Sequence, residues 1–271
     1  MAPPVTLGQL AADLSASGLV PGDIVMVHAG LRSIGPMIGG PDALIAALRQ
    51  VVGDAGTVMA YADWEGTPEW ACDEEGHILP QWREHVLPFD PARSRAIRDN
   101  GAFPEFLRTT PGALRSASPG PSMTALGAKA RWLIDPHPID YGYGPGTPLA
   151  RLVEARGKVM MIGAPWDTMT LLHHAEHLAS IPGKRIVRWD VPFADPDGGT
   201  IWRSVEEFDT GNPVVDGLED DYFQEIVRDF VAAGGGWQGQ IGAAPALLVD
   251  AAAISGFAVD WLEARFIGTT R

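Results

Sequence analysis

Three imidazoles and a carboxylate in the run His173-His174-Ala175-Glu176-His177 form the segment of this chain best equipped for proton chemistry. His173, Glu176 and His177 have i, i+3 and i+4 spacing, so they share one face of a predicted helix. A histidine that follows a strand-to-helix loop can act as a general base near neutral pH. The spacing of His173 and His177 also suits a metal site, although the acid is not at the offset of an HExxH motif. A purely structural role for the histidines is the third alternative.

A second concentration of functional groups lies in residues 63–75. The acidic residues are Asp63, Glu65, Glu69, Asp73, Glu74 and Glu75, and the tryptophans are Trp64 and Trp70. Carboxylates and aromatic faces together suit a cationic ligand, through Coulomb attraction and cation–π contact. A solvated acidic loop is the alternative.

Two further segments carry groups that could act in catalysis. The loop 29–40 joins a predicted strand to a helix, and its main-chain N–H groups, Arg32 and Ser33 could hold phosphate, although it matches neither a Walker A nor a GxGxxG pattern. Glu206-Glu207-Phe208-Asp209 supplies carboxylates that could orient a histidine, unless they are simply exposed. The chain has no GxSxG elbow, and its single cysteine, Cys72, lies in the acidic loop, so a covalent acyl-enzyme is not favoured.

Alternating strand and helix patterns must position these groups. Apolar runs predict buried strands over 24–28, 57–61 and 158–163, and an antiparallel pair over 185–189 and 200–204. Helices are predicted over 43–52, 103–107, 125–133, 168–179, 222–232 and 246–264. We therefore expect an α/β fold with a mixed, largely parallel central sheet flanked by helices. We expect residues 1–271 to form a single domain, with a loop-rich substrate segment at about 62–100.

Composition limits the partners of the chain. It has 271 residues, 46% of them hydrophobic and 20% charged, with a net charge of −14. Nucleic acid and anionic membranes are poor partners for such a surface, and a polycation is a good one. One cysteine excludes an internal disulfide and a cysteine-rich metal site. No signal segment and no apolar run of about 20 residues is present, so we expect a cytoplasmic protein, either a monomer or a homodimer.

Six motifs in order give the sequence a resemblance to a known family. They are Val27-His28-Ala29-Gly30-Leu31-Arg32-Ser33-Ile34-Gly35, Gly39-Gly40-Pro41, Gly56-Thr57-Val58-Met59, Arg115-Ser116-Ala117-Ser118-Pro119-Gly120-Pro121-Ser122, Gly144-Pro145-Gly146-Thr147-Pro148-Leu149 and Thr170-Leu171-Leu172-His173-His174-Ala175-Glu176. With these motifs the chain resembles the aminoglycoside 3-N-acetyltransferases, from about Leu7 to about Leu262. This family is unrelated to the GNAT acetyltransferases.

The resemblance implies a function and a set of residues. It implies transfer of acetyl from acetyl-coenzyme A to the 3-amino group of a 2-deoxystreptamine aminoglycoside, which confers antibiotic resistance, with no metal. It makes His173 the catalytic base and Glu207 the carboxylate that supports it. The residues expected to contact coenzyme A are Leu31, Arg32, Ser33, Ile34 and Gly35. The residues expected to contact the polycationic aminoglycoside are Asp63, Trp64, Glu65, Glu176 and Asp209.

Three alternatives remain open at this point. An acyltransferase of the same fold could act on another amine in biosynthesis, although a small neutral amine does not need six carboxylates. A hydrolase could use a metal bound by His173 and His177. A non-catalytic cation-binding module would bind aminoglycoside without turnover of coenzyme A.

Overall fold

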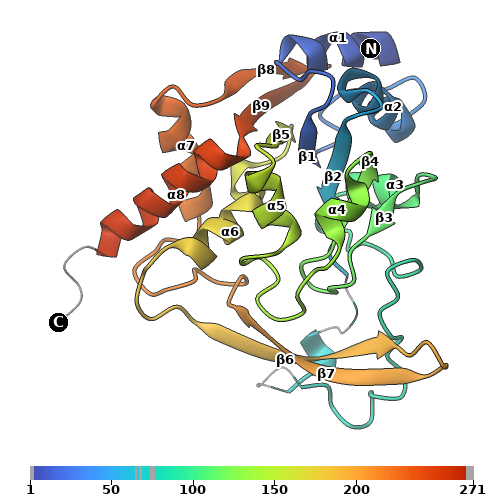
Figure 1. Cartoon of the computed structure of the whole chain (residues 1–271), viewed down its shortest axis with the longest axis vertical. Coiled ribbons are helices and arrows are strands. Elements are labelled where there is room, and N and C mark those ends of the chain that lie inside the picture. Colours follow the sequence, from blue (N-terminus) through green and yellow to red (C-terminus); the bar gives the residue numbers. More distant parts are fainter. Residues whose placement is uncertain (1–2, 65, 67–68, 74–76, 267–271) are drawn as a thin grey trace.

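A seven-stranded sheet with the order β3-β4-β2-β1-β5-β9-β8 forms the centre of the molecule (Figure 1). The computed structural model describes residues 3–64, 66, 69–73 and 77–266. The strands are β1 (Ile24–Ala29), β2 (Thr57–Tyr61), β3 (Leu114–Arg115), β4 (Met123–Gly127), β5 (Lys158–Ile162), β8 (Trp237–Ile241) and β9 (Ala244–Asp250). The prediction of a mixed α/β sheet flanked by helices is confirmed.

Parallel pairing is confined to the middle of this sheet. β1 pairs in parallel with β2 on one side and with β5 on the other. The outer pairs, β2 with β4, β3 with β4, β5 with β9 and β8 with β9, are all antiparallel. The expectation of a largely parallel sheet therefore holds for the central strands and is wrong for the outer ones.

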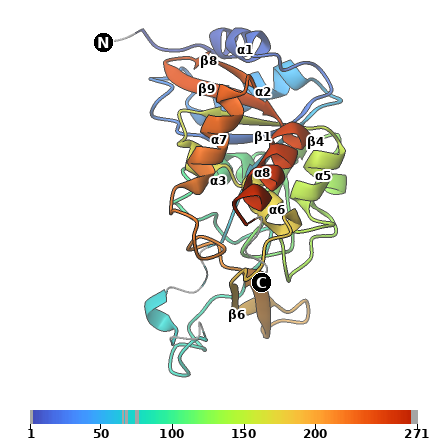
Figure 2. The same ribbon diagram turned by 90° about the vertical axis from the view of Figure 1, so that its left-hand side faces the viewer.

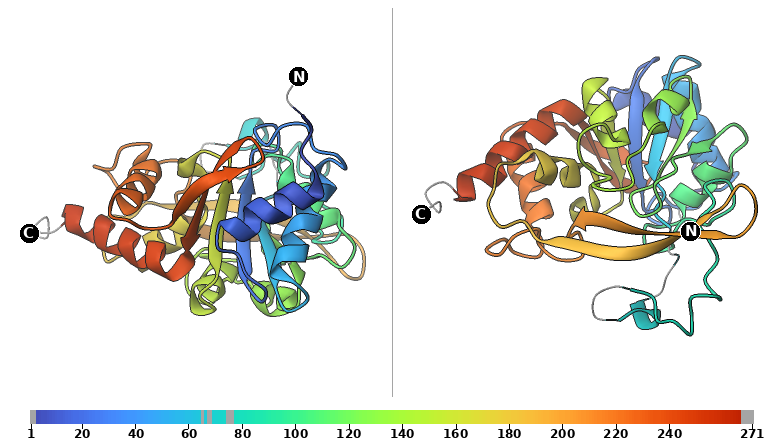
Figure 3. Two further views of the ribbon diagram at one scale, coloured as in Figure 1. Left: turned by 90° about the horizontal axis from the view of Figure 1, so that it is seen from above. Right: turned by 60° about the horizontal axis from the view of Figure 1, so that its bottom comes forward.

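Helices cover both faces of the sheet (Figure 3). One face packs against α4 (Ala130–Ile134), α5 (Pro148–Glu154), α6 (Leu171–Leu178), α7 (Tyr222–Ala232) and α8 (Ala251–Phe266). The other face packs against α1 (Leu7–Ala16), α2 (Pro41–Val52) and α3 (Phe103–Thr109). β1 is buried between the two layers, and its alternate side chains divide between them: Ile24 and Met26 face the first layer, while Val25 and Val27 face the second.

A separate hairpin, β6 (Ile186–Ala194) and β7 (Thr200–Phe208), lies beyond the carboxyl end of β2 (Figures 1 and 2). The predicted antiparallel pair is thus confirmed, with longer strands. The segment 62–100 runs beside the hairpin, and its described residues contain only one short 3-10 helix, η1 (Glu69–Ala71). A bridge between Phe89 and Phe193 joins the two, and the rings of these residues pack edge to face.

Two predicted helices are wrong at their amino-terminal ends. Residues 123–127 form strand β4 before α4 begins, and residues 244–250 form strand β9 before α8 begins. In both places a single charged residue, Lys129 or Asp250, separates the apolar run of the strand from that of the helix, so the two runs read as one continuous element. The sequence also did not predict the short strand β8 or helix α5. Within the described residues, no helix has the length and apolar composition needed to cross a membrane.

Candidate active site

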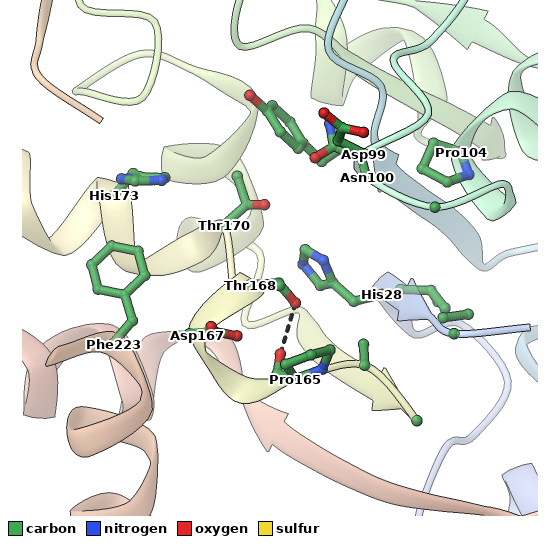
Figure 4. Close-up of a pocket in the computed structure, with 17 residues that line it drawn as sticks. His28, Asp99, Asn100, Pro104, Pro165, Asp167, Thr168, Thr170, His173 and Phe223 are labelled. Atoms are coloured by element: carbon green, nitrogen blue, oxygen red, sulfur yellow. Dashed lines mark hydrogen bonds between the residues drawn. The ribbon is translucent and has the colours of Figure 1, made fainter. Parts of the chain in front are cut away.

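The three parallel strands end at a cavity of about 330 Å³ (Figure 4). His28 of β1, Tyr61 of β2 and Gly163, which follows β5, line its base. The carboxyl ends of parallel strands are where α/β folds bind their ligands. The 3-10 helix η2 (Trp166–Thr168) and the start of α6 form one wall, which includes His173. Asp99 and Asn100 lie on the opposite side (Figure 4).

His173 forms a buried pair with a carboxylate on its own helix. Its Nδ1 lies 2.6 Å from Glu176 Oε2, and Glu176 is 1% exposed. The Tyr222 hydroxyl donates a hydrogen bond to the other carboxylate oxygen, Oε1. Burial and the adjacent carboxylate raise the pKa of Tyr222 well above its usual range, so this hydroxyl keeps its proton. With Nδ1–H donated to Glu176, the second ring nitrogen of His173 holds a lone pair and can accept a proton.

Two aromatic rings fix the plane of the His173 imidazole. The Tyr143 ring lies 4.9 Å from it and the Phe223 ring lies 4.8 Å from it, both measured between centroids. The His173 side chain nevertheless keeps 20% exposure. The ring is thus held in orientation while one edge stays accessible, as a general base requires.

The predicted support of His173 by Glu207 is wrong. Glu207, on β7, lies against the other histidine of the helix, with its Oε1 2.9 Å from His177 Nε2. The ring nitrogen is not aligned for a hydrogen bond, so the contact is one of charge and proximity. Glu207 meets His177 because this histidine lies one helical turn beyond His173 and faces the hairpin, where it also packs on Phe208. Glu176, at i+3 from His173, makes the contact with His173 that was expected of Glu207.

Two predicted substrate-binding carboxylates have partners inside the protein. Glu176 is buried by its bonds to His173 and Tyr222. Asp209 stabilises the turn after β7, where Oδ1 accepts bonds from the main-chain N–H of Gly211 at 3.0 Å and of Asn212 at 3.2 Å. Direct contact of Glu176 and Asp209 with the substrate stays a prediction.

A second cavity, of about 260 Å³, adjoins the first. Both are lined by Asp167, His173 and Phe223, so His173 stands at their junction. The second cavity is polar. Its remaining lining residues are Thr210, Gly211, Asn212, Pro213, Asp220 and Tyr222. Sequence reasoning missed Asp167 and Asp220, which lie in connections whose composition marks them only as loops.

The acidic segment after β2 has a less direct relation to His173. Asp63 Oδ1 accepts a hydrogen bond from Trp64 N at 2.6 Å, and the Trp64 ring packs on Phe89. Trp64 lines another cavity, of about 660 Å³, and neither it nor Asp63 lines the two at His173. Glu65 lies outside the described residues. The role of this segment in substrate binding stays a prediction.

The loop after β1 packs tightly beside the first cavity. The Ser33 hydroxyl donates to Gly163 O at 3.4 Å. A Cβ on Gly30 would lie 2.5 Å from the same oxygen, so only glycine permits this approach. The Ile34 side chain is fully buried in the core, so only its main chain is placed to meet coenzyme A, and this contact stays a prediction. Arg32 and Ser33 are exposed, Leu31 and Gly35 are half-buried, and their contact with the coenzyme stays a prediction.

His173 and His177 do not form a joint site for a metal. They contact different carboxylates, Glu176 and Glu207. Over the residues that the structure describes, no group of three or more His, Cys, Asp and Glu side chains could hold a metal ion.

Comparison with known proteins gives consistent matches over almost the whole chain. The profile of the aminoglycoside 3-N-acetyltransferase family matches residues 26–263. Aminoglycoside N(3)-acetyltransferase III of Pseudomonas aeruginosa is 44% identical over 264 residues, which are 97% of this chain and 95% of that protein. Aminoglycoside N(3)-acetyltransferase VIII of Streptomyces fradiae is 44% identical over 275 residues, 98% of this chain and 94% of the relative.

Solved structures agree with these matches. The binary complex of AAC-IIIb with CoASH superimposes with a TM-score of 0.95 at 64% identity, covering 97% of this chain and 98% of the other. AAC-VIa bound to sisomicin gives a TM-score of 0.91 at 36% identity, with coverage of 97% and 99%.

Proposed function

The chain belongs to the aminoglycoside 3-N-acetyltransferase family, and from this premise we propose that it transfers the acetyl group of acetyl-coenzyme A to the 3-amino group of a 2-deoxystreptamine aminoglycoside. Such a transfer removes a positive charge from the antibiotic and so confers resistance. The observation that carries the proposal is the His173–Glu176 pair at the junction of two cavities. Two substrates need two sites that meet at one base.

His173 accepts the proton that the amine must lose. The 3-amino group of the substrate reacts as a neutral amine, after its ammonium form has lost one proton to solvent. As its nitrogen attacks the thioester carbonyl carbon, the free ring nitrogen of His173 takes a second proton. The Glu176 carboxylate stabilises the resulting imidazolium through the 2.6 Å contact at Nδ1. The carbon–sulfur bond then breaks, and the proton passes to the departing thiolate. A general base of this kind contributes about 10²–10⁴-fold in rate.

The two cavities differ in their lining residues, and we infer that each takes one substrate. The cavity beside the His173 pair that contains Asp167 and Asp220 is rich in polar groups and suits an ammonium-bearing sugar. The cavity at the strand ends is bounded by main chain at Gly30 and Gly163 and adjoins the exposed Arg32 and Ser33. It suits the narrow thioester arm of the coenzyme, with Arg32 available to its phosphates.

A thiol-release assay tests the proposal. Purified protein with acetyl-coenzyme A and a panel of 2-deoxystreptamine aminoglycosides should release coenzyme A thiol and yield a product acetylated at the 3-amino position. His173→Ala should reduce kcat/KM by at least 10²-fold. His177→Gln, one turn along the same helix, is the matched control and should stay within tenfold of wild type. Absence of thiol release with every member of the panel would reject the proposed function.

A further inference from the structure

His28 lies on the face of the sheet that carries the catalytic helix. Side chains alternate along β1, so His28 points to the same side as Ile24 and Met26, which pack against the layer containing α6. It is the last side chain on that face of β1 before the loop at Gly30. Figure 4 shows its imidazole pointing into the cavity, with His173 on one side and Asp99 and Asn100 on the other.

The His28 ring lacks the partner that buried imidazoles normally have. Its Nε2 is buried and has no hydrogen-bond partner among the described residues. Two buried histidines nearby are satisfied: His174 Nδ1 contacts Tyr143 O at 2.8 Å, and His137 contacts Ser116 Oγ and Gly142 O at 2.9 and 2.7 Å. His177 Nε2 also lacks a hydrogen bond, but it lies 2.9 Å from Glu207 Oε1. A buried polar group without a partner destabilises the fold, so an orphan at the base of a cavity indicates a missing ligand atom.

The protonation state of His28 limits what it can do. Burial lowers the pKa of His28 to about 4, so the ring is neutral at physiological pH. A neutral imidazole carries one N–H donor and no charge. So weak a base is unsuited to take the proton of the amine, but its N–H remains available as a hydrogen-bond donor in a site shielded from water.

We propose that His28 donates a hydrogen bond to the acyl oxygen of acetyl-coenzyme A and stabilises the oxyanion that forms during transfer. This role rests on the proposed function. As the carbon–nitrogen bond forms, the π electrons of the carbonyl move onto its oxygen. They return when the carbon–sulfur bond breaks, and the sulfur leaves with the bond pair. The proton from nitrogen passes through His173, so His28 itself exchanges none.

Geometry favours the acyl oxygen over other groups of the substrates. The reacting amine must lie within hydrogen-bond reach of His173, and the acyl carbon must lie about 3–3.5 Å from that nitrogen. In a cavity of about 330 Å³ that both histidines line, the acyl group occupies the space between them. His173 is on the amine side, which leaves the opposite side, where His28 lies, to the oxygen.

Three variants test the donor. His28→Phe keeps a ring and removes both nitrogens. His28→Gln places an amide N–H near the position of Nε2, whereas His28→Asn places one near the position of Nδ1. For each variant we would measure kcat and KM in the thiol-release assay, the Kd for free coenzyme A, and Tm. Free coenzyme A carries no acyl oxygen, so its affinity separates the proposed bond from a contact with the rest of the coenzyme.

We expect His28→Phe to lower kcat by about 10²–10³-fold, the usual effect of losing one oxyanion donor. The Kd for free coenzyme A should stay within threefold, Tm should be unchanged or higher, and the shape of the pH–rate profile should stay that of wild type. His28→Gln should retain at least ten times the kcat of His28→Asn. If His28→Phe does not fold, the Gln and Asn variants decide alone.

Three results would overturn the inference. They are a loss of kcat below tenfold in His28→Phe, a fall in coenzyme A affinity that matches the fall in kcat/KM, and equal kcat values for the Gln and Asn variants. An active wild type with any of these outcomes rejects the role of His28 and leaves the proposed function standing. An inactive wild type rejects both.

Discussion

Replacing Glu176 by glutamine should disable His173 as a base, because the amide NH₂ group would face its Nδ1. In the protein, Glu176 accepts a hydrogen bond at each oxygen, from Tyr222 at Oε1 and from His173 at Oε2. A glutamine has one acceptor and one donor. The Tyr222 hydroxyl keeps its proton, because burial and the carboxylate raise its pKa, so the amide oxygen should turn towards Tyr222. The amide NH₂ then faces Nδ1 of His173, which forces the ring proton onto the nitrogen that should act as the base.

The magnitude follows from the lost contact. A hydrogen bond between charged groups contributes about 1.5–3 kcal/mol, and the imidazolium that forms in the reaction loses that stabilisation, which is about 10–150-fold in rate. The wrong tautomer removes the base from most molecules and adds about another tenfold. We expect kcat of Glu176→Gln to fall by about 10²–10³-fold, with a KM for aminoglycoside within threefold of wild type.

Steady-state kinetics with two further variants test this reasoning. The double variant Glu176→Gln with Tyr222→Phe frees the amide to rotate, so it should recover about tenfold of the lost kcat. Glu207→Gln, which alters the contact with His177, should lose less than tenfold. A Glu176→Gln enzyme with more than a tenth of the wild-type kcat, or a greater loss in Glu207→Gln, would refute the assigned pairing.

Three other perturbations have expected outcomes. Asp220→Asn should raise KM for aminoglycoside about tenfold, or ~1.4 kcal/mol. Asp197→Asn, an exposed control with the same change of charge, should leave KM unchanged. Equal KM values for the two variants would show that Asp220 is not part of the substrate site. Burial lowers the pKa of His137 to about 4, so between pH 6.5 and 4 the unfolded chain binds a proton that the folded one does not. The free energy of unfolding should thus decrease as pH is lowered from 6.5 to 4, by up to about 1.4 kcal/mol per pH unit for this group. Urea titrations of His137→Gln should show a smaller decrease over the same range. Dialysis against a chelator should leave activity unchanged, and loss of activity restored by zinc would contradict a metal-free mechanism.

The sequence predicts those elements whose ends are marked by turn or cap residues. Strand β2 and helix α7 appear with the predicted bounds, and β2 is preceded by a glycine. The sequence predicts one helix over β9 and α8, because Ala244–Asp250 and the residues after it are mostly apolar and only tertiary pairing with β5 and β8 separates the strand from the helix. Apolar runs indicate which residues are buried, but pairing with neighbouring strands decides whether such a run is a strand or a helix.

The site shows the same division. The sequence predicts His173 as the base, and the spacing shows a carboxylate, Glu176, at i+3 from it. The resemblance, however, implies that Glu176 contacts the substrate. Only the bond from Tyr222, which is 46 residues away, shows that Glu176 is an internal partner. Asp167 and Asp220 reach one cavity from connections far apart in the chain, so no local pattern could join them. His28 did carry a local signal, as a lone imidazole at the end of an otherwise apolar strand.

The shared wall of the two cavities has a consequence for inhibition. Asp167, His173 and Phe223 line both cavities, so on the proposed assignment the two substrates occupy separate spaces that meet at this wall. Coenzyme A should therefore compete with acetyl-coenzyme A and not with the antibiotic in product-inhibition patterns. A single molecule that joins an aminoglycoside to the pantetheine thiol by a short spacer would span the junction. Once one half is bound, the other half has a high effective concentration at the adjoining cavity, so such a conjugate should bind far more tightly than either parent.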